Sequence, residues 1–401
     1  MTKASTIFDG SKNSMTKREI LRLSMLNGNY SISDLSKEIN ISVPTVTKII
    51  GELIDEGFMT DLGKIGTSGG RRPSIFGLNS DAGYFIGVAI ERQHIHIAIT
   101  DFKGEVCGLI PNLEFILEAN ADSFKSLCRI IKESVASHGI DWEKVLGVGV
   151  SLSGRVNPEE GYSMSYFMSD DLPLNAIFEK DLNVPVVIEN DSRAMAYGEF
   201  MAGGLDKGTR NVLYINLSWG LGMGMILDGK LYYGKSGFSG EIGHFPFMDN
   251  DKRCRCGKVG CLETGASGTA LRDMIIQKLK EGRSSSLSKK YKKGEEITLD
   301  DILNAVKAED MLAIDCLGEI GEILGKAIAG LINIFNPDTV IIGGRLIVGK
   351  NYLLYPIKTA VNKYSLNRVS SDTKIVFSKL DRKAAPIGDC LIARSSFLSI
   401  K

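Results

Sequence analysis

The sequence lacks the features that mark membrane, secreted and strongly charged proteins. It contains no run of about 18 consecutive apolar residues, and the segment 1–14 is polar. These absences exclude a membrane-spanning helix and a secretory signal, so we expect a cytoplasmic protein without membrane insertion. Neither sign of charge dominates, because Lys+Arg and Asp+Glu both number 48. Any DNA binding must therefore come from the placement of charges rather than from their sum.

The cysteines do not form a disulfide framework. They number seven, and four of them are scattered in apolar surroundings: Cys107, Cys128, Cys316 and Cys390. An odd number of mostly isolated thiols is typical of a reducing compartment.

The remaining three cysteines are clustered. The run Cys254-Arg-Cys256-Gly-Lys-Val-Gly-Cys261 follows His244 after a short gap. One imidazole and three thiolates are the ligand set of a closed tetrahedral zinc site. Glycines inside the run would let the loop fold sharply around an ion. We therefore predict structural Zn²⁺ at His244, Cys254, Cys256 and Cys261.

The first 80 residues predict a winged helix. Helical patterns cover about 16–26, begin again at Ser33, and follow Ser42 with Pro44 in the first turn of the third helix. Two short strands around a glycine-rich loop, at 58–60 and 74–78, are typical of a wing. We assign a disordered tail to 1–13 and a winged helix-turn-helix DNA-binding domain, with its linker, to 14–80.

Five residues of this domain are candidates for contacts with operator DNA. The amino-terminal end of the third helix would enter the major groove, and the wing would follow phosphates or the minor groove. The candidates are Thr45, Thr47, Lys48, Arg71 and Arg72. The alternative is a protein-docking module of the same shape, with solvated arginines.

From Tyr84 onward, strands alternate with helices, and polar residues follow strand ends. This order predicts an α/β fold, in which ligands bind at the carboxyl ends of strands. A second set of strands and helices after about residue 211 indicates two lobes.

Several motifs in this region resemble the ROK family of repressors, open reading frames and sugar kinases. The motifs are Gly154-Arg-Val-Asn-Pro, Glu189-Asn-Asp-Ser, Gly240-Glu-Ile-Gly-His, the cysteine run with Cys-Leu-Glu263, and Asn333-Ile-Phe-Asn-Pro with Ile-Gly-Gly. The resemblance implies a two-lobed actin-like ATPase fold. Lobe 1 would cover 81–196, with 383–401 returning to it, and lobe 2 would cover 197–382 with the zinc loop.

The resemblance also implies a sugar in the cleft between the lobes. The residues at the matching positions are Gly154, Arg155, Asn190, Asp191, Glu241, His244 and Glu263. Carboxylates and amides pair well with vicinal hydroxyls, and each buried polar group demands a partner, which gives selectivity. For Asp191 the simpler alternative is a helix cap.

Two segments depart from the ROK kinases. Where those kinases have an Asp-X-Gly-Gly-Thr phosphate loop, this chain has Ala89-Ile-Glu-Arg-Gln93, and where they resemble Gly-Thr-Gly it has Ser218-Trp-Gly220. Phosphoryl transfer depends on positioning and on charge neutralisation, both of which these changes oppose. We therefore predict no catalytic residues and no enzyme activity.

Together these features predict a sugar-responsive transcriptional regulator, a repressor of carbohydrate-utilisation genes. It would bind operator DNA as a homodimer or homotetramer and take a sugar or sugar derivative as effector. Two alternatives stay open. One is a sugar kinase with an added DNA-binding domain, and the other is a regulator controlled by a protein partner such as a transporter component.

Overall fold

The computed structural model describes residues 11–64, 73–164 and 172–398. The chain divides into two compact units. Unit 1 joins residues 1–190 to the carboxy-terminal segment 386–401, and unit 2 comprises residues 191–385. The predicted disordered tail lies largely outside the described residues, which begin just before the first helix. The two units are described separately below.

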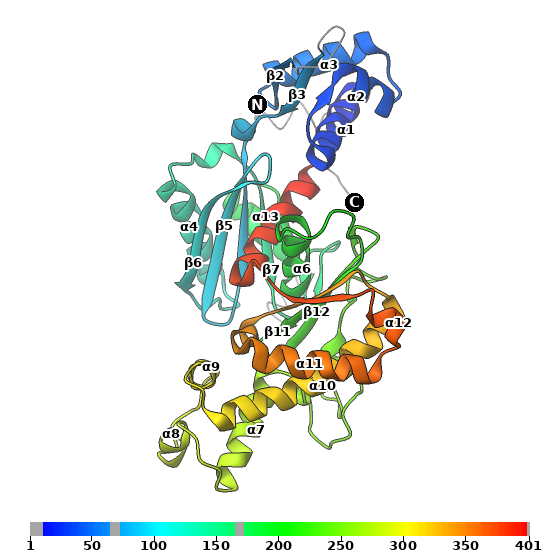
Figure 1. Cartoon of the computed structure of the whole chain (residues 1–401). Helices are drawn as coiled ribbons and strands as arrows, with labels where there is room; N and C mark the ends of the chain where they lie inside the picture. Colours follow the sequence, from blue (N-terminus) through cyan, green and yellow to red (C-terminus); the bar gives the residue numbers. More distant parts are fainter. Residues whose placement is uncertain (1–10, 65–72, 165–171, 399–401) are drawn as a thin grey trace. The chain divides into compact units, whose positions relative to one another are not determined.

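The amino-terminal part of unit 1 is a winged helix (Figure 1). Its helices are α1 (Lys12–Asn27), α2 (Ile32–Glu38) and α3 (Val43–Asp55). Its sheet has the order β1-β3-β2, with β1 (Tyr30–Ser31), β2 (Met59–Lys64) and β3 (Ser74–Leu78). The helices and the wing strands therefore lie where the sequence predicts them.

Local sequence explains how these helices begin and pack. Ser31 caps α2 by accepting a hydrogen bond from the backbone N–H of Asp34. Helix α3 buries the apolar face that begins at Val46. The buried Lys17 of α1 joins the two helices, because its ammonium lies 2.9 Å from Glu52 and 2.6 Å from Glu56 of α3 and its cap. A buried ammonium needs such partners to offset its desolvation.

The rest of unit 1 is built on a five-stranded sheet with the order β10-β7-β4-β5-β6. The strands are β4 (Tyr84–Ile90), β5 (His94–Asp101), β6 (Val106–Glu114), β7 (Val145–Leu152) and β10 (Val186–Asn190). Strands β4, β7 and β10 are parallel, whereas β5 and β6 form an antiparallel meander. The short β8 (Val156–Asn157) and β9 (Tyr162–Ser163) pair after β7.

Three helices accompany this sheet. Helices α4 (Ala121–Ser137) and α5 (Leu174–Leu182) share one apolar core with its strands. Helix α13 (Ala384–Phe397) approaches the strands directly at two glycines, because a Cβ at Gly87 would meet the carbonyl of Pro386 and one at Gly149 would meet that of Asp389. The chain therefore returns to this unit at its carboxyl end.

Unit 2 has its own five-stranded sheet, with the order β13-β12-β11-β14-β15. The strands are β11 (Val212–Leu217), β12 (Leu221–Leu227), β13 (Lys230–Leu231), β14 (Thr339–Gly343) and β15 (Lys374–Phe377). Helix α6 (Asp191–Ala202) packs against β11 and β12. A Cβ at Gly224 of β12 would meet the carbonyl of Ser192, so this glycine allows the close approach.

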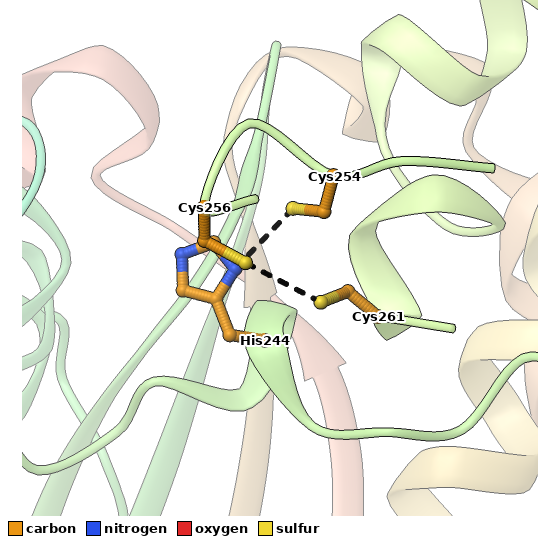
Figure 2. A group of neighbouring side chains, drawn as sticks. All are labelled: His244, Cys254, Cys256 and Cys261. Atoms are coloured by element: carbon orange, nitrogen blue, oxygen red, sulfur yellow. Dashed lines mark hydrogen bonds between the residues drawn. The ribbon is translucent and has the colours of Figure 1, made fainter. Parts of the chain in front are cut away.

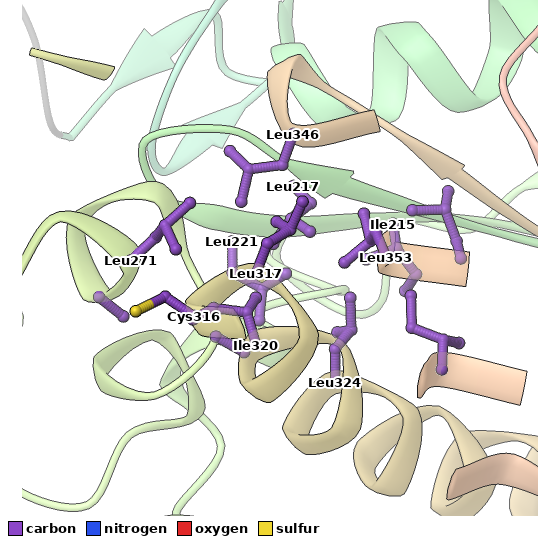
Figure 3. Close-up of a cluster of buried hydrophobic side chains, with 14 of the residues drawn as sticks. Ile215, Leu217, Leu221, Leu271, Cys316, Leu317, Ile320, Leu324, Leu346 and Leu353 are labelled. Atoms are coloured by element: carbon purple, nitrogen blue, oxygen red, sulfur yellow. The ribbon is translucent and has the colours of Figure 1, made fainter. Parts of the chain in front are cut away.

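The other helices of unit 2 bury its large apolar core. They are α7 (Gly268–Lys280), α8 (Ser288–Lys292), α9 (Leu299–Lys307), α10 (Met311–Phe335), α11 (Asn351–Tyr364) and α12 (Asn367–Ser370). Figure 3 shows Leu317, Ile320 and Leu324 of α10 directed towards the strand residues Ile215 and Leu217. Among the described residues, none of the helices combines the length and the apolar character needed to cross a membrane.

Candidate functional site

The cysteine run of unit 2 folds as a tight loop between two short 3₁₀ helices, Ile242–His244 and Leu262–Thr264. Gly257 and Gly260 have φ values of +88° and +79°, in the left-handed region that favours glycine. The backbone N–H of Cys254 donates to the carbonyl of Lys258 over 2.8 Å, which closes the turn. The glycines thus allow the sharp turn that the sequence predicts for this loop.

The loop brings the four predicted metal ligands together (Figure 2). His244 Nδ1 lies 3.5 Å from Cys254 Sγ, and Cys256 Sγ lies 3.6 Å from Cys261 Sγ. All four ligand atoms lie within 4.8 Å of one another. A tetrahedral zinc site with ordinary bond lengths has edges of about 3.5–3.8 Å. The residues therefore fit a single metal ion.

The thiols of this cluster differ in their surroundings. Burial is the largest influence on Cys254 and raises its pKa to about 12. The pKa of Cys256 is lowered, chiefly because the backbone N–H of Lys258 hydrogen-bonds its sulfur. A bound cation would hold all three sulfurs as thiolates and release protons on binding.

Two carboxylates flank the cluster. His244 Nε2 lies 3.8 Å from Glu241 Oε2, so the ring directs one nitrogen towards the cysteines and the other towards a predicted sugar ligand. Glu263 Oε2 accepts a hydrogen bond from the backbone N–H of Leu221 over 3.1 Å, and its other oxygen lies 3.8 Å from Cys254 Sγ. The cluster and both carboxylates therefore form one local group in unit 2.

The other predicted sugar residues lie at strand ends. Asn190, the last residue of β10, donates through Nδ2 to the carbonyl of Gly154 over 2.8 Å, and Gly154 itself has a φ of +92°. Arg155 follows Gly154, and its carbonyl accepts from the backbone N–H of Met164. Asp191 begins α6, and its Oδ1 accepts from the N–H of Ser192 over 2.7 Å. Asn190, Gly154 and Arg155 thus belong to unit 1, whereas Asp191 belongs to unit 2.

The two segments that are predicted to differ from the ROK kinases each include a hydrogen-bonded turn. Ala89 and Ile90 lie inside β4, and the N–H of Glu91 donates to the carbonyl of His94 over 2.9 Å. The second turn joins β11 to β12, where the carbonyl of Trp219 accepts from the N–H and the hydroxyl of Thr269, each over 3.0 Å.

The amino-terminal end of α3 presents the predicted DNA-contacting side chains to solvent. Thr45, Thr47 and Lys48 are exposed, and the Lys48 side chain is 79% exposed. The Thr47 hydroxyl donates to the carbonyl of Val43 over 2.8 Å. The predicted contacts Arg71 and Arg72 lie outside the described residues.

Three buried polar residues, Ser151, Asp389 and Arg193, were not predicted from the sequence. Ser151 at the end of β7 donates to Asp389 of α13 over 2.7 Å, and both side chains are buried. Arg193, in the first turns of α6, is also buried. The sequence gives little signal for its burial, because α6 also contains the charged residues Asp191 and Glu199.

Comparisons with known proteins follow the same division of the chain. Residues 85–396 match the ROK family, and residues 16–58 match the family described as winged helix-turn-helix DNA-binding. Both predicted parts of the fold are therefore confirmed.

Individual relatives include regulators and a kinase. The chain is 31% identical to the xylose repressor of Caldicellulosiruptor bescii over 96% of each sequence. It is 30% identical to a glucokinase of Halalkalibacterium halodurans over 76% of this chain and 93% of the glucokinase. A crystal structure of a ROK family transcriptional regulator, a homolog of the Escherichia coli MLC protein, superposes with a TM-score of 0.80 at 30% identity and covers 97% of each chain. These matches confirm the predicted regulator class, and the chain belongs to the ROK family.

Proposed function

We propose that the protein is a sugar-responsive transcriptional regulator that represses carbohydrate-utilisation genes. The observation that carries the proposal is that a winged helix precedes the ROK domain and that the xylose repressor matches both parts over 96% of each chain. The glucokinase match covers a smaller share of the chain. Fold alone does not decide function, so the proposal also depends on the residues of the site.

In this proposal a sugar binds through the residues that the family motifs predict. Glu241, Glu263 and Asp191 would accept hydrogen bonds from hydroxyls, and Asn190 would donate and accept them. His244 would donate through Nε2, the nitrogen that faces Glu241. Gly154 and Arg155 would line the same site. Polar groups of this kind reject ligands that leave them unpaired.

Structural Zn²⁺ would brace this group of residues. His244, Cys254, Cys256 and Cys261 supply four protein ligands, which leaves no open position for a reactive water. The ion would fix the imidazole through Nδ1. Because the short loop that holds the cysteines ends next to Glu263, the ion would also restrict the position of Glu263. The metal then orders the pocket and takes no part in chemistry.

We further propose that the chain does not transfer phosphate. This proposal is supported by the sequence at Glu91, where the family resemblance predicts a glycine-rich phosphate loop in the kinases, and by the Trp219 turn, which makes two hydrogen bonds to Thr269. A carboxylate opposes a triphosphate by charge. A sugar kinase with a DNA-binding head remains the second candidate, because the H. halodurans glucokinase is 30% identical.

DNA binding is assigned to the winged helix. Thr45, Thr47 and Lys48 would contact bases and phosphates in the major groove, and Arg71 and Arg72 would contact the backbone or the minor groove. A homodimer or homotetramer would place two heads on half-sites about 34 Å apart, or a multiple of that spacing. A nearly complete switch between bound and released states requires the sugar to favour one conformer by about 10⁴-fold.

A ligand screen combined with an ATP assay tests this proposal. We expect one of D-xylose, D-glucose and N-acetyl-D-glucosamine to raise the thermal unfolding temperature of the full-length protein. Incubation of that sugar with Mg·ATP should give no sugar phosphate. Formation of sugar phosphate would favour the kinase, whereas binding of none of the three sugars would contradict this sugar-responsive regulator.

A further inference from the structure

Arg193 is a buried cation in unit 2. The residue is 2% exposed, although it lies only two residues after Asp191 at the start of α6. A guanidinium in the interior is costly unless it is paired and hydrogen-bonded. Its partners therefore show what the side chain does.

Two contacts of Arg193 are made with one loop, the segment that follows β13. Its Nη1 donates to the carbonyl of Gly237 over 2.6 Å, and Gly237 is itself buried. Its guanidinium carbon lies 5.5 Å from the centre of the Tyr233 ring, in the range of a cation–π interaction. A charge-assisted hydrogen bond to a buried carbonyl is among the stronger polar contacts in a protein.

This loop connects β13 to the segment that begins at Glu241. Near its start, the N–H of Tyr232 donates to the carbonyl of Met225, and the hydroxyl of Ser239 donates to the carbonyl of Tyr232 over 2.6 Å. At its end, Gly240 has a φ of +85°, and a Cβ there would meet the carbonyl of Met223. The loop is thus hydrogen-bonded to β12 at its start and lies close against β12 at its end, and Arg193 joins its middle to α6.

We propose that Arg193 is a positioning residue for sugar binding. Arg193 lies on α6, which begins with Asp191, and it holds the loop that leads to Glu241 and His244. In this way it would keep the distance between Asp191 and the pair Glu241 and His244 constant. This inference rests on the proposed sugar-binding function. Arginine suits the role better than lysine, because its planar fork can bond a carbonyl and stack on an aromatic ring together.

Removal of the guanidinium should loosen the loop without unfolding the unit. The loop would then have to be ordered when the sugar binds, and ordering of a few residues is expected to weaken affinity by roughly 10-fold or more. DNA affinity measured without sugar should not change, because the winged helix lies in unit 1.

Isothermal titration of the full-length protein with D-xylose, D-glucose and N-acetyl-D-glucosamine tests the proposal. We expect Arg193→Met to raise the Kd of the bound sugar at least 10-fold, Arg193→Lys to restore part of the affinity, and sugar-free DNA affinity to stay at the wild-type value. The matched control is Arg210→Met, since Arg210 is exposed and pairs with Asp228 on the surface of the same unit.

The outcomes distinguish a failure of the positioning role of Arg193 from a failure of the proposed sugar-binding function. If wild type binds one of the sugars and Arg193→Met binds it equally well, the positioning role is wrong and the proposed function stands. If wild type binds none of the three, the proposed function and this inference both fail. Should Arg193→Met not fold, Arg193→Lys decides: a raised Kd with wild-type zinc content supports the role, and an unchanged Kd overturns it.

Discussion

The ring of Phe58 packs against the ring of Phe102, with 5.6 Å between their centres and 51° between their planes. Phe58 immediately precedes the first wing strand, and Phe102 lies in the turn between β5 and β6. Both are fully buried, and Phe85 and Phe397 extend the same aromatic cluster. The DNA-binding head therefore shares a core with the sheet of unit 1 and with its last helix.

Backbone hydrogen bonds fix the linker beside these rings. The N–H of Asn79 donates to the carbonyl of Phe58 over 2.9 Å, and the N–H of Phe102 donates to the carbonyl of Ser80. The buried Arg394 of α13 donates to the carbonyl of Phe102 over 2.9 Å. A movement of the sheet or of α13 would thus be transmitted to the winged helix through these packed side chains.

Phe58→Ala should destabilise unit 1 by about 3–5 kcal/mol, because it leaves a cavity in a buried aromatic cluster. The chain has two tryptophans, Trp142 in unit 1 and Trp219 in unit 2. In a Trp219→Phe background, the fluorescence of Trp142 therefore follows the urea unfolding of unit 1 alone. Leu62→Ala on the exposed part of β2 serves as control and should cost much less. Equal losses for the two variants would argue against the shared core.

Lys48→Ala should reduce the slope of log affinity against log salt concentration by about one, as expected for the loss of one phosphate contact. Fluorescence anisotropy with duplex DNA from upstream of the protein's own gene measures this slope. Lys289→Ala, in the exposed basic run of α8, should leave it unchanged. An unaltered slope for Lys48→Ala would remove this residue from the DNA interface.

Cys256→Ser should lower both zinc content and sugar affinity, because it removes one of the four ligands that hold His244 and the loop. Metal analysis of the purified protein and sugar titration provide the two readouts. Cys107→Ser in β6 is the matched control, since this cysteine belongs to unit 1 and the cluster belongs to unit 2. Wild-type metal content together with wild-type sugar affinity in Cys256→Ser would show that the cluster has no bracing role.

Asp338→Asn should weaken unit 2 at neutral pH but not in acid. Asp338 Oδ2 accepts from the N–H groups of Arg210 and Asn211 over 2.9 and 2.8 Å, and these bonds hold its pKa below the usual value. Because the folded pKa is the lower one, this stabilisation is present above the unfolded pKa of about 3.9 and is lost as pH falls through the folded value.

Urea midpoints at pH 7 and at acid pH test this dependence. The midpoints of wild type and Asp338→Asn should differ at pH 7 and converge in acid, while the exposed Asp372→Asn should follow wild type at both. A difference that stays constant with pH would assign the effect to something other than the carboxylate.

Local signals made much of the fold predictable from the sequence. Pro44 in the first turn of α3 and the apolar face of that helix predict it, although Ser42 makes no side-chain capping hydrogen bond. The cluster of candidate metal ligands follows from the spacing of three cysteines near His244. In each case the interacting residues are close in sequence, so a local sequence pattern is enough to predict the structure.

Contacts between distant residues were not predictable in this way. Ser151 and Asp389 are 238 residues apart, and Arg193 and Gly237 are 44 apart. Neither pair has a spacing rule, because tertiary packing of a strand or loop on a helix brings them together. The predicted sugar residues came from family motifs, and their common action on a ligand remains a prediction.

The most direct test of the proposed function measures DNA affinity with and without sugar on one preparation. Full-length protein is titrated against its upstream DNA in the absence and presence of the sugar that raises its unfolding temperature, with wild type compared to Asp191→Asn. We expect the sugar to lower wild-type DNA affinity at least 10-fold and to leave Asp191→Asn unaffected. DNA affinity that is independent of sugar in the wild type, from a protein that binds that sugar, would contradict the regulator proposed here.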